Sequence, residues 1–414
     1  MPANLQEVTF DTLTYGGKAL GHLPDGRAIF VPFGLPGERA RVRVLQEKRG
    51  YARGELVEVL QPAQTRIMSR CKHFGVCGGC HYQHMPYEQQ LEVKQEILRD
   101  QLKRIGHIED APVQATAPSI NPWHYRNEVQ FHLTREGQLG YVRASPDPTA
   151  AQTILAVEEC HMLEPTINEL WPQLQFEGDS GVERVSIRGG RDDSLMLMLE
   201  GSRRELPELE IEGELSVIHL FGEDCVLISG DDHVNVRALK RDFRVSAPSF
   251  FQVNTKMAEK MVEYVLQLTP RAANTVLDVY CGVGLFSAFL AARCKRLVGI
   301  EIAAAACEDF GVNLDEFENV ELYEAAAEEA LPALKLKPDL VIVDPPRAGV
   351  AVKALDALVQ MEPARIIYVS CDPSTLARDL RRLTDNDYHL IQVTPFDMFP
   401  QTFHIESISL LERA

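Results

Sequence analysis

The hydrophobic and polar positions of the chain follow three different patterns, one after another. In the first sixty residues, short runs such as Ala40–Val44 and Glu55–Val59 alternate between apolar and polar positions, and glycine and proline turns separate them. A period of two is typical of half-buried strands, and it places Arg41 and Arg43 on one face of their strand. The pattern therefore predicts a small all-β barrel that ends near Gln61.

The middle of the chain is more mixed. A cysteine-rich loop is expected over residues 70–82, and apolar residues at near-helical spacing predict a helix over residues 87–106. Between residues 120 and 240, runs such as Glu128–Leu133 and Leu195–Leu199 have strand character. We therefore expect a β-rich central domain.

From about residue 244, strands are expected to alternate with helices. The strand candidates are Thr275–Val279, Arg296–Ile300, Leu340–Val343 and Ile366–Val369, and Leu285–Arg293 is one of the helices between them. Alternation of this kind indicates βαβ units around a parallel sheet, in which ligands bind outside the carboxyl ends of the strands. The fold class expected for this part is therefore α/β.

Composition and charge narrow the class of protein. The 414 residues are 45% hydrophobic and 25% charged. No apolar stretch approaches the roughly 18–20 residues that span a bilayer, so we expect a cytoplasmic protein without a membrane segment. A net charge of −18 argues against a protein that simply coats nucleic acid. Basic residues nevertheless gather between Leu35 and Lys72, which suits either local contact with phosphates or a solvated β surface.

Three cysteines stand close together in the predicted loop. Cys71, Cys77 and Cys80 form a C-x5-C-x2-C pattern with glycines between them, a spacing that is typical of a metal centre. An all-cysteine site needs a fourth thiolate, and Cys160 is the best candidate. Either zinc or an iron–sulfur cluster would suit four cysteines. The remaining cysteines, Cys371 excepted, fit buried thiols in a reducing compartment.

A glycine turn follows the first strand of the α/β region, in Asp278-Val279-Tyr280-Cys281-Gly282-Val283-Gly284. Gly282 and Gly284 allow the backbone to approach a ligand that a Cβ atom would repel. Glu301 ends the next strand and is placed to accept hydrogen bonds from ribose hydroxyls. The turn lacks the full six-residue dinucleotide fingerprint, so S-adenosylmethionine is favoured over NAD. A tight turn without a ligand is the alternative.

Asp344-Pro345-Pro346-Arg347 follows another strand, and its two prolines make this loop stiff. In enzymes that methylate amino groups, an aromatic residue follows a comparable motif and stacks on the target base. Arg347 stands in that place here, which argues against chemistry at an exocyclic amine. A rigid turn without chemistry is the alternative.

Cys371 lies directly after a predicted strand, where the sequence Asp372-Pro373 indicates the start of a helix. Adding a thiolate to C6 of a pyrimidine makes C5 nucleophilic, so that C5 can attack a methyl sulfonium, and a base must then remove the C5 proton. We expect the helix N-terminus to lower the pKa of the Cys371 thiol. The base candidates are His404 and Glu406, which share one side of a predicted strand, although either would also suit a surface position.

Together these motifs resemble the S-adenosylmethionine-dependent RNA (uracil-5-)-methyltransferases, and most of all the iron–sulfur members that make 5-methyluridine in 23S ribosomal RNA. The resemblance covers nearly the whole chain. It implies that Cys371 is the nucleophile, that Glu406 is the base, and that four cysteines hold a [4Fe–4S] cluster. The cofactor-site residues are then Gln252 of Phe250-Phe251-Gln252-Val253-Asn254, Tyr280, Gly282, Glu301 and Asp344, and the cluster ligands are Cys71, Cys77, Cys80 and Cys160.

The resemblance also implies a division into domains. Residues 1–61 would form an OB-like RNA-binding barrel, known as a TRAM domain. Residues 70–88 and 118–243 would form a β-rich iron–sulfur domain. Residues 89–117 and 244–414 would form a Rossmann-like methyltransferase domain with a mostly parallel sheet.

We therefore expect an enzyme that flips one uridine out of a structured RNA and methylates its C5 through an adduct with Cys371. The expected substrate is 23S ribosomal RNA, and transfer RNA is an alternative. Cytosine-5 methylation is disfavoured, because those enzymes usually place a proline before the nucleophile and Ser370 stands there. A non-catalytic RNA-binding or assembly protein of the same fold is a further alternative. The cluster is expected to be structural or to position RNA, and the oligomeric state is left open, with a monomer as the default.

Overall fold

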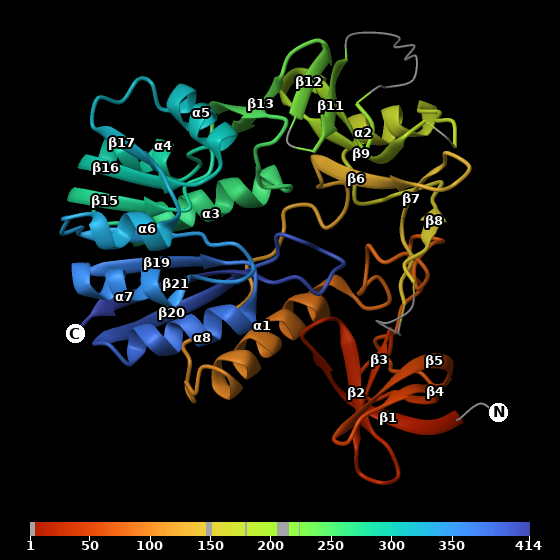
Figure 1. Ribbon diagram of the computed structural model, residues 1–414. Helices are drawn as coiled ribbons and strands as arrows, with labels where there is room; N and C mark the ends of the chain where they lie inside the picture. Colours follow the sequence, from red (N-terminus) through yellow and green to blue (C-terminus); the bar gives the residue numbers. More distant parts are fainter. Residues whose placement is uncertain (1–4, 146–150, 179, 205–214, 223) are drawn as a thin grey trace.

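The computed structural model describes residues 5–145, 151–178, 180–204, 215–222 and 224–414. Along this part of the chain a barrel, a central sheet and a larger C-terminal sheet follow one another (Figure 1). The first four residues of the predicted barrel and short stretches of the predicted central domain lie outside the described residues.

The N-terminal barrel has five strands, as the alternating pattern predicts. They close in the order β1-β2-β3-β5-β4, with the bounds β1 (Leu5–Thr14), β2 (Lys18–His22), β3 (Ala28–Pro32), β4 (Arg39–Glu47) and β5 (Tyr51–Gln61). Ala40 and Val42 are fully buried inside the barrel. Arg41 and Arg43 lie outside, where each forms an ion pair with a glutamate of β5. The basic charge of this face is therefore partly neutralised by the barrel's own carboxylates.

The cysteine loop, residues 62–86, connects the barrel to helix α1 (Tyr87–Arg104) and contains no helix or strand. An isolated bridge pairs Cys77 with Arg143, beside the central sheet. The backbone N–H groups of His81 and Tyr82 both donate to the carbonyl oxygen of Gln401, far along the chain. The loop thus contacts both the central region and the C-terminal domain.

The central sheet has seven strands in the order β12-β11-β10-β9-β6-β7-β8. Their bounds are β6 (Glu128–Leu133), β7 (Leu139–Val142), β8 (Ile154–Ala156), β9 (Val182–Gly189), β10 (Leu195–Gly201), β11 (Ser216–Phe221) and β12 (Asp224–Ser229). Helix α2 (Pro165–Leu170) and the 3-10 turn η1 (Trp171–Gln173) complete its core, in which Phe131 and Trp171 are buried, and a second turn, η2 (Arg191–Asp193), precedes β10. The β-rich character predicted for this region is confirmed.

A separate hairpin of β13 (His233–Ala238) and β14 (Arg241–Ser246) follows the central sheet. It packs on helix α5 (Ala304–Asn313), and its buried Phe243 belongs to the same hydrophobic cluster as residues of the C-terminal domain. The boundary drawn from the sequence at residue 243 falls inside β14. The division into domains stays a prediction.

The C-terminal domain is built on a seven-stranded sheet of order β17-β16-β15-β18-β19-β21-β20. Its strands are β15 (Ala273–Val279), β16 (Cys294–Glu301), β17 (Val320–Glu324), β18 (Leu340–Val343), β19 (Arg365–Ser370), β20 (Tyr388–Phe396) and β21 (Glu406–Arg413). Strands β15 to β19 are parallel, whereas β21 is antiparallel to β19 and β20 and lies between them. All four residues of β18 are fully buried, as expected for a parallel strand covered on both faces. The predicted α/β fold is confirmed.

Helices cover both faces of this sheet (Figure 1). Besides α5 they are α3 (Thr255–Leu268), α4 (Ser287–Leu290), α6 (Ala327–Ala333), α7 (Val352–Met361) and α8 (Pro373–Thr384). The helix predicted over Leu285–Arg293 is shorter, because a turn extends through Phe286 and α4 gives way to the 3-10 turn η3 (Ala291–Arg293). None of the helices in the described part of the chain combines the length and the apolar character that a membrane span requires.

Helix α1 lies against the C-terminal domain although it precedes the central sheet in the sequence (Figure 1). It packs on α8, and Leu98 and Leu102 join the hydrophobic cluster on that side of the sheet. Beyond α1, Val113 and Ala117 form parallel bridges to residues of β20. This early segment therefore extends the C-terminal domain beside β20, the edge strand of its sheet.

Candidate active site

The turn that carries Cys371 joins β19 to α8 at the carboxyl edge of the sheet. Asp372 caps α8: its Oδ1 accepts hydrogen bonds from the backbone N–H groups of Ser374 (2.9 Å) and Thr375 (3.1 Å). Pro373 follows at the first helical position, which lacks a partner for an N–H group in any helix. The strand-then-helix arrangement predicted from the sequence thus places a half-buried Cys371 where parallel sheets bind ligands.

Glu406 lies across from Cys371. In the antiparallel pairing of β19 with β21, Ser370 is opposite Ser407, so Cys371 and Glu406 come next on the two strands. The Glu406 side chain is buried, with 3% of the residue exposed. Burial and the neighbouring Asp344 carboxylate raise the pKa of Glu406 well above its usual range, while the Arg347 guanidinium acts in the opposite direction. The structure therefore brings the predicted nucleophile and base together.

The expected low pKa of the Cys371 thiol is wrong for the protein on its own. Burial and the carboxylates of Glu406 and Asp344 raise the pKa of Cys371 to about 12, against the lowering effect of Arg347. The N–H groups at the start of α8 already donate to Asp372, whose own charge also raises this pKa. The N–H groups at the start of α8 are therefore used by the Asp372 cap, and Cys371 stays protonated as a thiol.

The glycine turn predicted for a cofactor follows β15. Tyr280 has a positive φ of 64°, and its N–H donates to the carbonyl oxygen of Ile300 on the neighbouring strand. Gly282 has a φ of 54°, and a Cβ atom built there would meet nothing within 4 Å. A Cβ atom on Gly284 would instead come within 2.4 Å of the Leu314 side chain. Gly282 therefore fits the expected open approach to a ligand, whereas Gly284 is needed for packing against the end of α5.

Glu301, at the end of β16, lies beside this turn. Its Oε2 accepts a hydrogen bond from the N–H of Gly282 (3.0 Å), and its Oε1 accepts from the N–H groups of Ile302 (2.8 Å) and Ala303 (2.9 Å). Three backbone donors fix the carboxylate at the carboxyl edge of the sheet. Tyr280, Gly282 and Glu301 are thus brought together, as the sequence predicts.

Two further carboxyl groups lie at the same edge. The backbone N–H of Asp344 donates to the carbonyl oxygen of Val279, which places it beside the end of β15. Asp278, on β15 itself, accepts from the Ser287 hydroxyl (2.6 Å) through Oδ2, while its buried Oδ1 has no partner among the described residues. Burial raises the pKa of both carboxyl groups to about 7. Asp278 was not assigned a role from the sequence, although a lone acid inside an apolar strand is a signal of one.

Gln252 lies in the segment before α3 and is largely buried. Its carbonyl oxygen accepts a hydrogen bond from Asn127 Nδ2 (3.0 Å), just before the first strand of the central sheet. Asn254 caps α3 by accepting from the N–H of Met257. Among the described residues no hydrogen bond joins the Gln252 side chain to the glycine turn, so its assignment rests on the resemblance.

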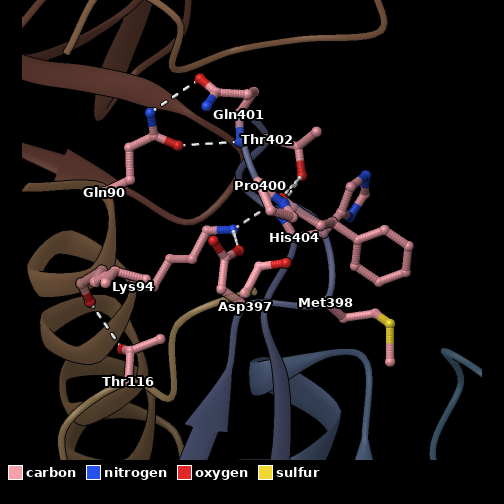
Figure 2. A network of polar contacts seen from close by, with 12 residues as sticks. Gln90, Lys94, Thr116, Asp397, Met398, Pro400, Gln401, Thr402 and His404 are labelled. Carbon is pink, nitrogen blue, oxygen red and sulfur yellow. Dashed lines mark hydrogen bonds and ion pairs between the residues drawn. The ribbon is translucent and has the colours of Figure 1, made fainter. Parts of the chain in front are cut away.

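The segment between β20 and β21, residues 397–405, leads directly to Glu406 and is fixed by α1 (Figure 2). Lys94 Nζ of α1 contacts Asp397 Oδ1 at 2.5 Å and donates to the carbonyl oxygen of Phe399 at 3.0 Å, and both members of this ion pair are fully buried. Gln90 and Gln401 exchange two hydrogen bonds of 3.0 Å. No sequence pattern indicates this network, because its partners lie about 300 positions apart.

The four predicted cluster ligands line one cavity of about 250 Å³, between the cysteine loop and the central sheet. Burial raises the pKa of Cys77 to about 11 and that of Cys80 to about 12, and it also raises the pKa of Cys71. The Tyr141 hydroxyl donates to Cys160 Sγ (3.6 Å). In the described part of the chain no group of three or more histidine, cysteine, aspartate or glutamate side chains is arranged to hold a metal ion. A metal centre therefore stays a prediction.

Comparison with known proteins agrees with the fold. Residues 224–414 match the family model described as tRNA (Uracil-5-)-methyltransferase, and residues 4–57 match the TRAM domain model. The chain is 34% identical to an uncharacterized RNA methyltransferase of Halalkalibacterium halodurans, over 98% of this chain and 96% of that protein. It is 33% identical to another from Aquifex aeolicus, over 98% of both.

Among solved structures, the tRNA (uracil-54, C5)-methyltransferase of Pyrococcus abyssi in complex with S-adenosyl-L-homocysteine is similar along 98% of this chain and 100% of that chain. The TM-score is 0.73 and the sequence identity is 24%, so this likeness supports the fold. With the relatives above, the evidence extends to the activity class. The chain belongs to the family of RNA (uracil-5-)-methyltransferases, enzymes that take their methyl group from S-adenosylmethionine.

Proposed function

We propose that this enzyme methylates C5 of one uridine in a structured RNA through a covalent bond between Cys371 Sγ and C6 of the base. The observation that carries the proposal is the placement of Cys371 opposite the buried Glu406, at the sheet edge that also holds the glycine turn. A uracil ring between these two side chains would have its C6 near the thiol and its C5 near the carboxylate.

The reaction requires two proton transfers that involve protein side chains, one from Cys371 and one to Glu406. The half-buried Cys371 passes its proton to solvent before Sγ bonds to C6, and Arg347 is the nearby cation that favours both the thiolate and the ionised Glu406. S-adenosylmethionine supplies the methyl group on a positively charged sulfur. Once C5 carries the methyl group, Glu406 accepts the C5 proton, the C5–C6 double bond re-forms and the Cys371 thiolate leaves.

Glu406 suits the role of base better than His404. Burial lowers the pKa of His404 to about 3, so its ring has little affinity for a proton. The pKa of Glu406 is shifted upward, which makes its carboxylate a stronger base than an exposed one. We therefore keep Glu406 as the base.

The cofactor site is proposed to consist of Gln252, Tyr280, Gly282, Glu301 and Asp344. Gly282 offers the open approach, and the fixed carboxylate of Glu301 is placed to accept from hydroxyl groups of a ribose. We add Asp278, since its buried Oδ1 lacks a partner among the described residues at the same edge. A hydroxyl or ammonium group would satisfy that oxygen.

We further propose that Cys71, Cys77, Cys80 and Cys160 hold a [4Fe–4S] cluster. The residues fit such a group: all four line one cavity, and N–H groups of His73 and Gly79 point at two of the sulfurs, each at 3.4 Å. A cluster supplies positive charge that thiolates need in a buried place. Its proposed role is structural or RNA-positioning. Zinc is the other metal that four cysteines suit.

The substrate we propose first is 23S ribosomal RNA, from the iron–sulfur resemblance. Transfer RNA is the second candidate, because the matched family model and the similar structure from Pyrococcus abyssi both carry tRNA in their descriptions. The TRAM barrel is the proposed RNA-binding module. All nine cysteines are unpaired, which suits the cytoplasm, and we keep the expectation of a monomer.

The mechanism is tested with two variants and RNA from cells that lack this enzyme. Glu406→Gln should accumulate RNA attached to Cys371, detectable as a shifted band and as a modified peptide by mass spectrometry. Cys371→Ala should give no adduct and should lower the methylation rate at least about 10³-fold. Cys225→Ala, at an exposed cysteine on β12, is the matched control and should behave like wild type.

Methylation that survives in Cys371→Ala would sink the covalent mechanism. The substrate is settled by measuring 5-methyluridine in ribosomal and transfer RNA separately, with and without the enzyme. Loss from transfer RNA alone would favour the second candidate over the first. Appearance of 5-methylcytidine as the only product would overturn the assignment to uridine.

A further inference from the structure

The barrel reaches the turn that carries Cys371. Between β1 and β2, the chain turns at Gly16 and Gly17, whose φ angles are 96° and 73°. A Cβ atom on Gly17 would come within 3.2 Å of His81 Cβ and 3.3 Å of Phe403 Cβ. This turn is therefore packed closely between the cysteine loop and the segment that leads to Glu406.

Tyr15, at the head of this turn, contacts the residue after Cys371. Its hydroxyl donates to Asp372 Oδ2 at 3.0 Å, across 357 positions in the sequence. The tyrosine ring also packs edge-on against the Phe403 ring, with centroids 5.8 Å apart. Burial and the Asp372 carboxylate raise the pKa of Tyr15 well above its usual range, so the phenol remains a donor.

The two oxygens of Asp372 have separate tasks. Oδ1 caps α8 by accepting from Ser374 N, Ser374 Oγ and Thr375 N. Oδ2 accepts from Tyr15, the one donor to that oxygen among the described residues. The backbone of the same turn is closed by Ser370 Oγ, which accepts from the N–H of Asp372 at 3.2 Å. The barrel therefore supplies one of the hydrogen bonds that hold this turn.

We propose that Tyr15 is a positioning residue for Cys371, so that the packing of the barrel against this turn and the orientation of the Cys371 side chain are coupled. The inference rests on the proposed function of Cys371. It gives the barrel a second task besides RNA contact: the phenol holds the Asp372 carboxylate and offsets part of its charge beside the thiol. A hydrogen bond to a charged group is among the stronger ones in proteins.

The test is Tyr15→Phe, which keeps the ring contact with Phe403 and removes only the hydroxyl. We expect kcat to fall about tenfold, with KM for RNA and for S-adenosylmethionine within about twofold of wild type. In the enzyme without RNA, alkylation of Cys371 by iodoacetamide should slow at a given pH, measured on the Cys371 peptide by mass spectrometry. The less neutralised Asp372 should also move the pH midpoint of alkylation upward.

The matched control is Tyr388→Phe, which also removes a buried phenol donor. Tyr388 donates to the carbonyl oxygen of Pro363 (3.0 Å) at the opposite end of β20 from the residue that pairs with Glu406. It should change neither kcat nor the alkylation of Cys371. A double variant, Tyr15→Phe with Asp372→Asn, should lose little more than Asp372→Asn alone, because both act through one contact.

Unchanged kcat and alkylation in Tyr15→Phe would overturn the proposal. So would a rise in KM for RNA with kcat preserved, which would make Tyr15 an RNA contact, or losses that add fully in the double variant. Failure of the proposed function is a separate outcome, seen as methylation that persists in Cys371→Ala. The alkylation of Cys371 reports on its positioning in either case.

Discussion

Two regions of this enzyme present thiols, and they are built in opposite ways. Cys371 stands at the end of a regular strand, opposite Glu406 in the sheet and beside a capped helix. Three of the four proposed cluster ligands lie in the cysteine loop, which contains no helix or strand. The first thiol has the carboxylates of Glu406 and Asp344 as neighbours, whereas the four proposed cluster ligands line one cavity together.

This difference shows what each thiol depends on. Strand β19 and the Asp372 cap of α8 position Cys371 without a bound ligand. The four cysteines share a partly exposed cavity, and its loop side contains no helix or strand, so a bound cluster would contribute directly to the folding of that loop. Removing a cysteine should therefore disturb chemistry in the first region and folding in the second.

The largest effect is expected from Cys77→Ser. If the proposed cluster is present, loss of one of its ligands should reduce the iron content at least about tenfold and lower the thermal midpoint by about 10 °C or more, because cluster binding and folding are then linked. Iron is measured by elemental analysis and the midpoint by calorimetry. Cys371→Ser is the control across the comparison and should keep both values. Full iron content in Cys77→Ser would break the comparison.

The buried pair that joins α1 to the segment before Glu406 is tested by Lys94→Met. Asp397 would lose its buried partner, which costs about 3–5 kcal/mol in the free energy of unfolding measured in urea. Lys103→Met removes an exposed pair with Glu109 and should cost less than about 1 kcal/mol. Equal effects of the two variants would show that the buried pair does not fix the segment before Glu406.

A smaller effect concerns the carboxyl groups near Cys371. Burial raises the pKa of Asp344 to about 7, above its unfolded value of about 3.9. The folded state then binds more protons than the unfolded state, so this contribution to stability is present below about pH 4 and is lost as the pH rises through 7. Asp344→Asn should remove that loss.

Between pH 5 and pH 8, wild type should therefore lose at least about 1 kcal/mol more stability than Asp344→Asn, the equivalent of one pKa unit. Urea unfolding at both pH values measures the difference. Asp315→Asn, at an exposed position, should follow wild type. Parallel losses in Asp344→Asn and wild type would contradict the burial of a carboxyl group at this site.

The smallest effect is expected from Tyr141→Phe, which removes the hydroxyl that donates to Cys160 Sγ. Hydrogen bonds to cluster sulfurs favour the reduced, more negative state. The reduction potential of the cluster should therefore fall by a few tens of mV, since a bond worth about 1 kcal/mol corresponds to that shift for one electron. Iron content should not change, and a potential that rises would contradict this geometry.

The sequence predicts the individual elements of this site better than it predicts which of them lie next to one another. The alternation of strands with helices locates the glycine turn, Glu301 and Asp344 at one sheet edge, because parallel strands end on the same side. The pairing of Cys371 with Glu406 requires β21 to enter the sheet between β19 and β20, which periodicity does not reveal. The buried pair of Lys94 and Asp397 is invisible for the same reason.

The one chemical expectation that failed was the pKa of Cys371. A helix N-terminus lowers a thiol pKa when its N–H groups are free to face the sulfur. Here Asp372 occupies them, and Glu406 adds a second acid across the sheet. Local sequence shows the start of the helix but not the charges that tertiary structure gathers around it.

The position of β21 links the sheet to the site. Without this strand β19 would present an open edge, a state prone to association with other chains. Because Glu406 is the first residue of that strand, the site has its proposed acceptor for the C5 proton only when β21 pairs with β19. A chain in which β21 has not joined the sheet therefore lacks the proposed base and cannot complete the reaction.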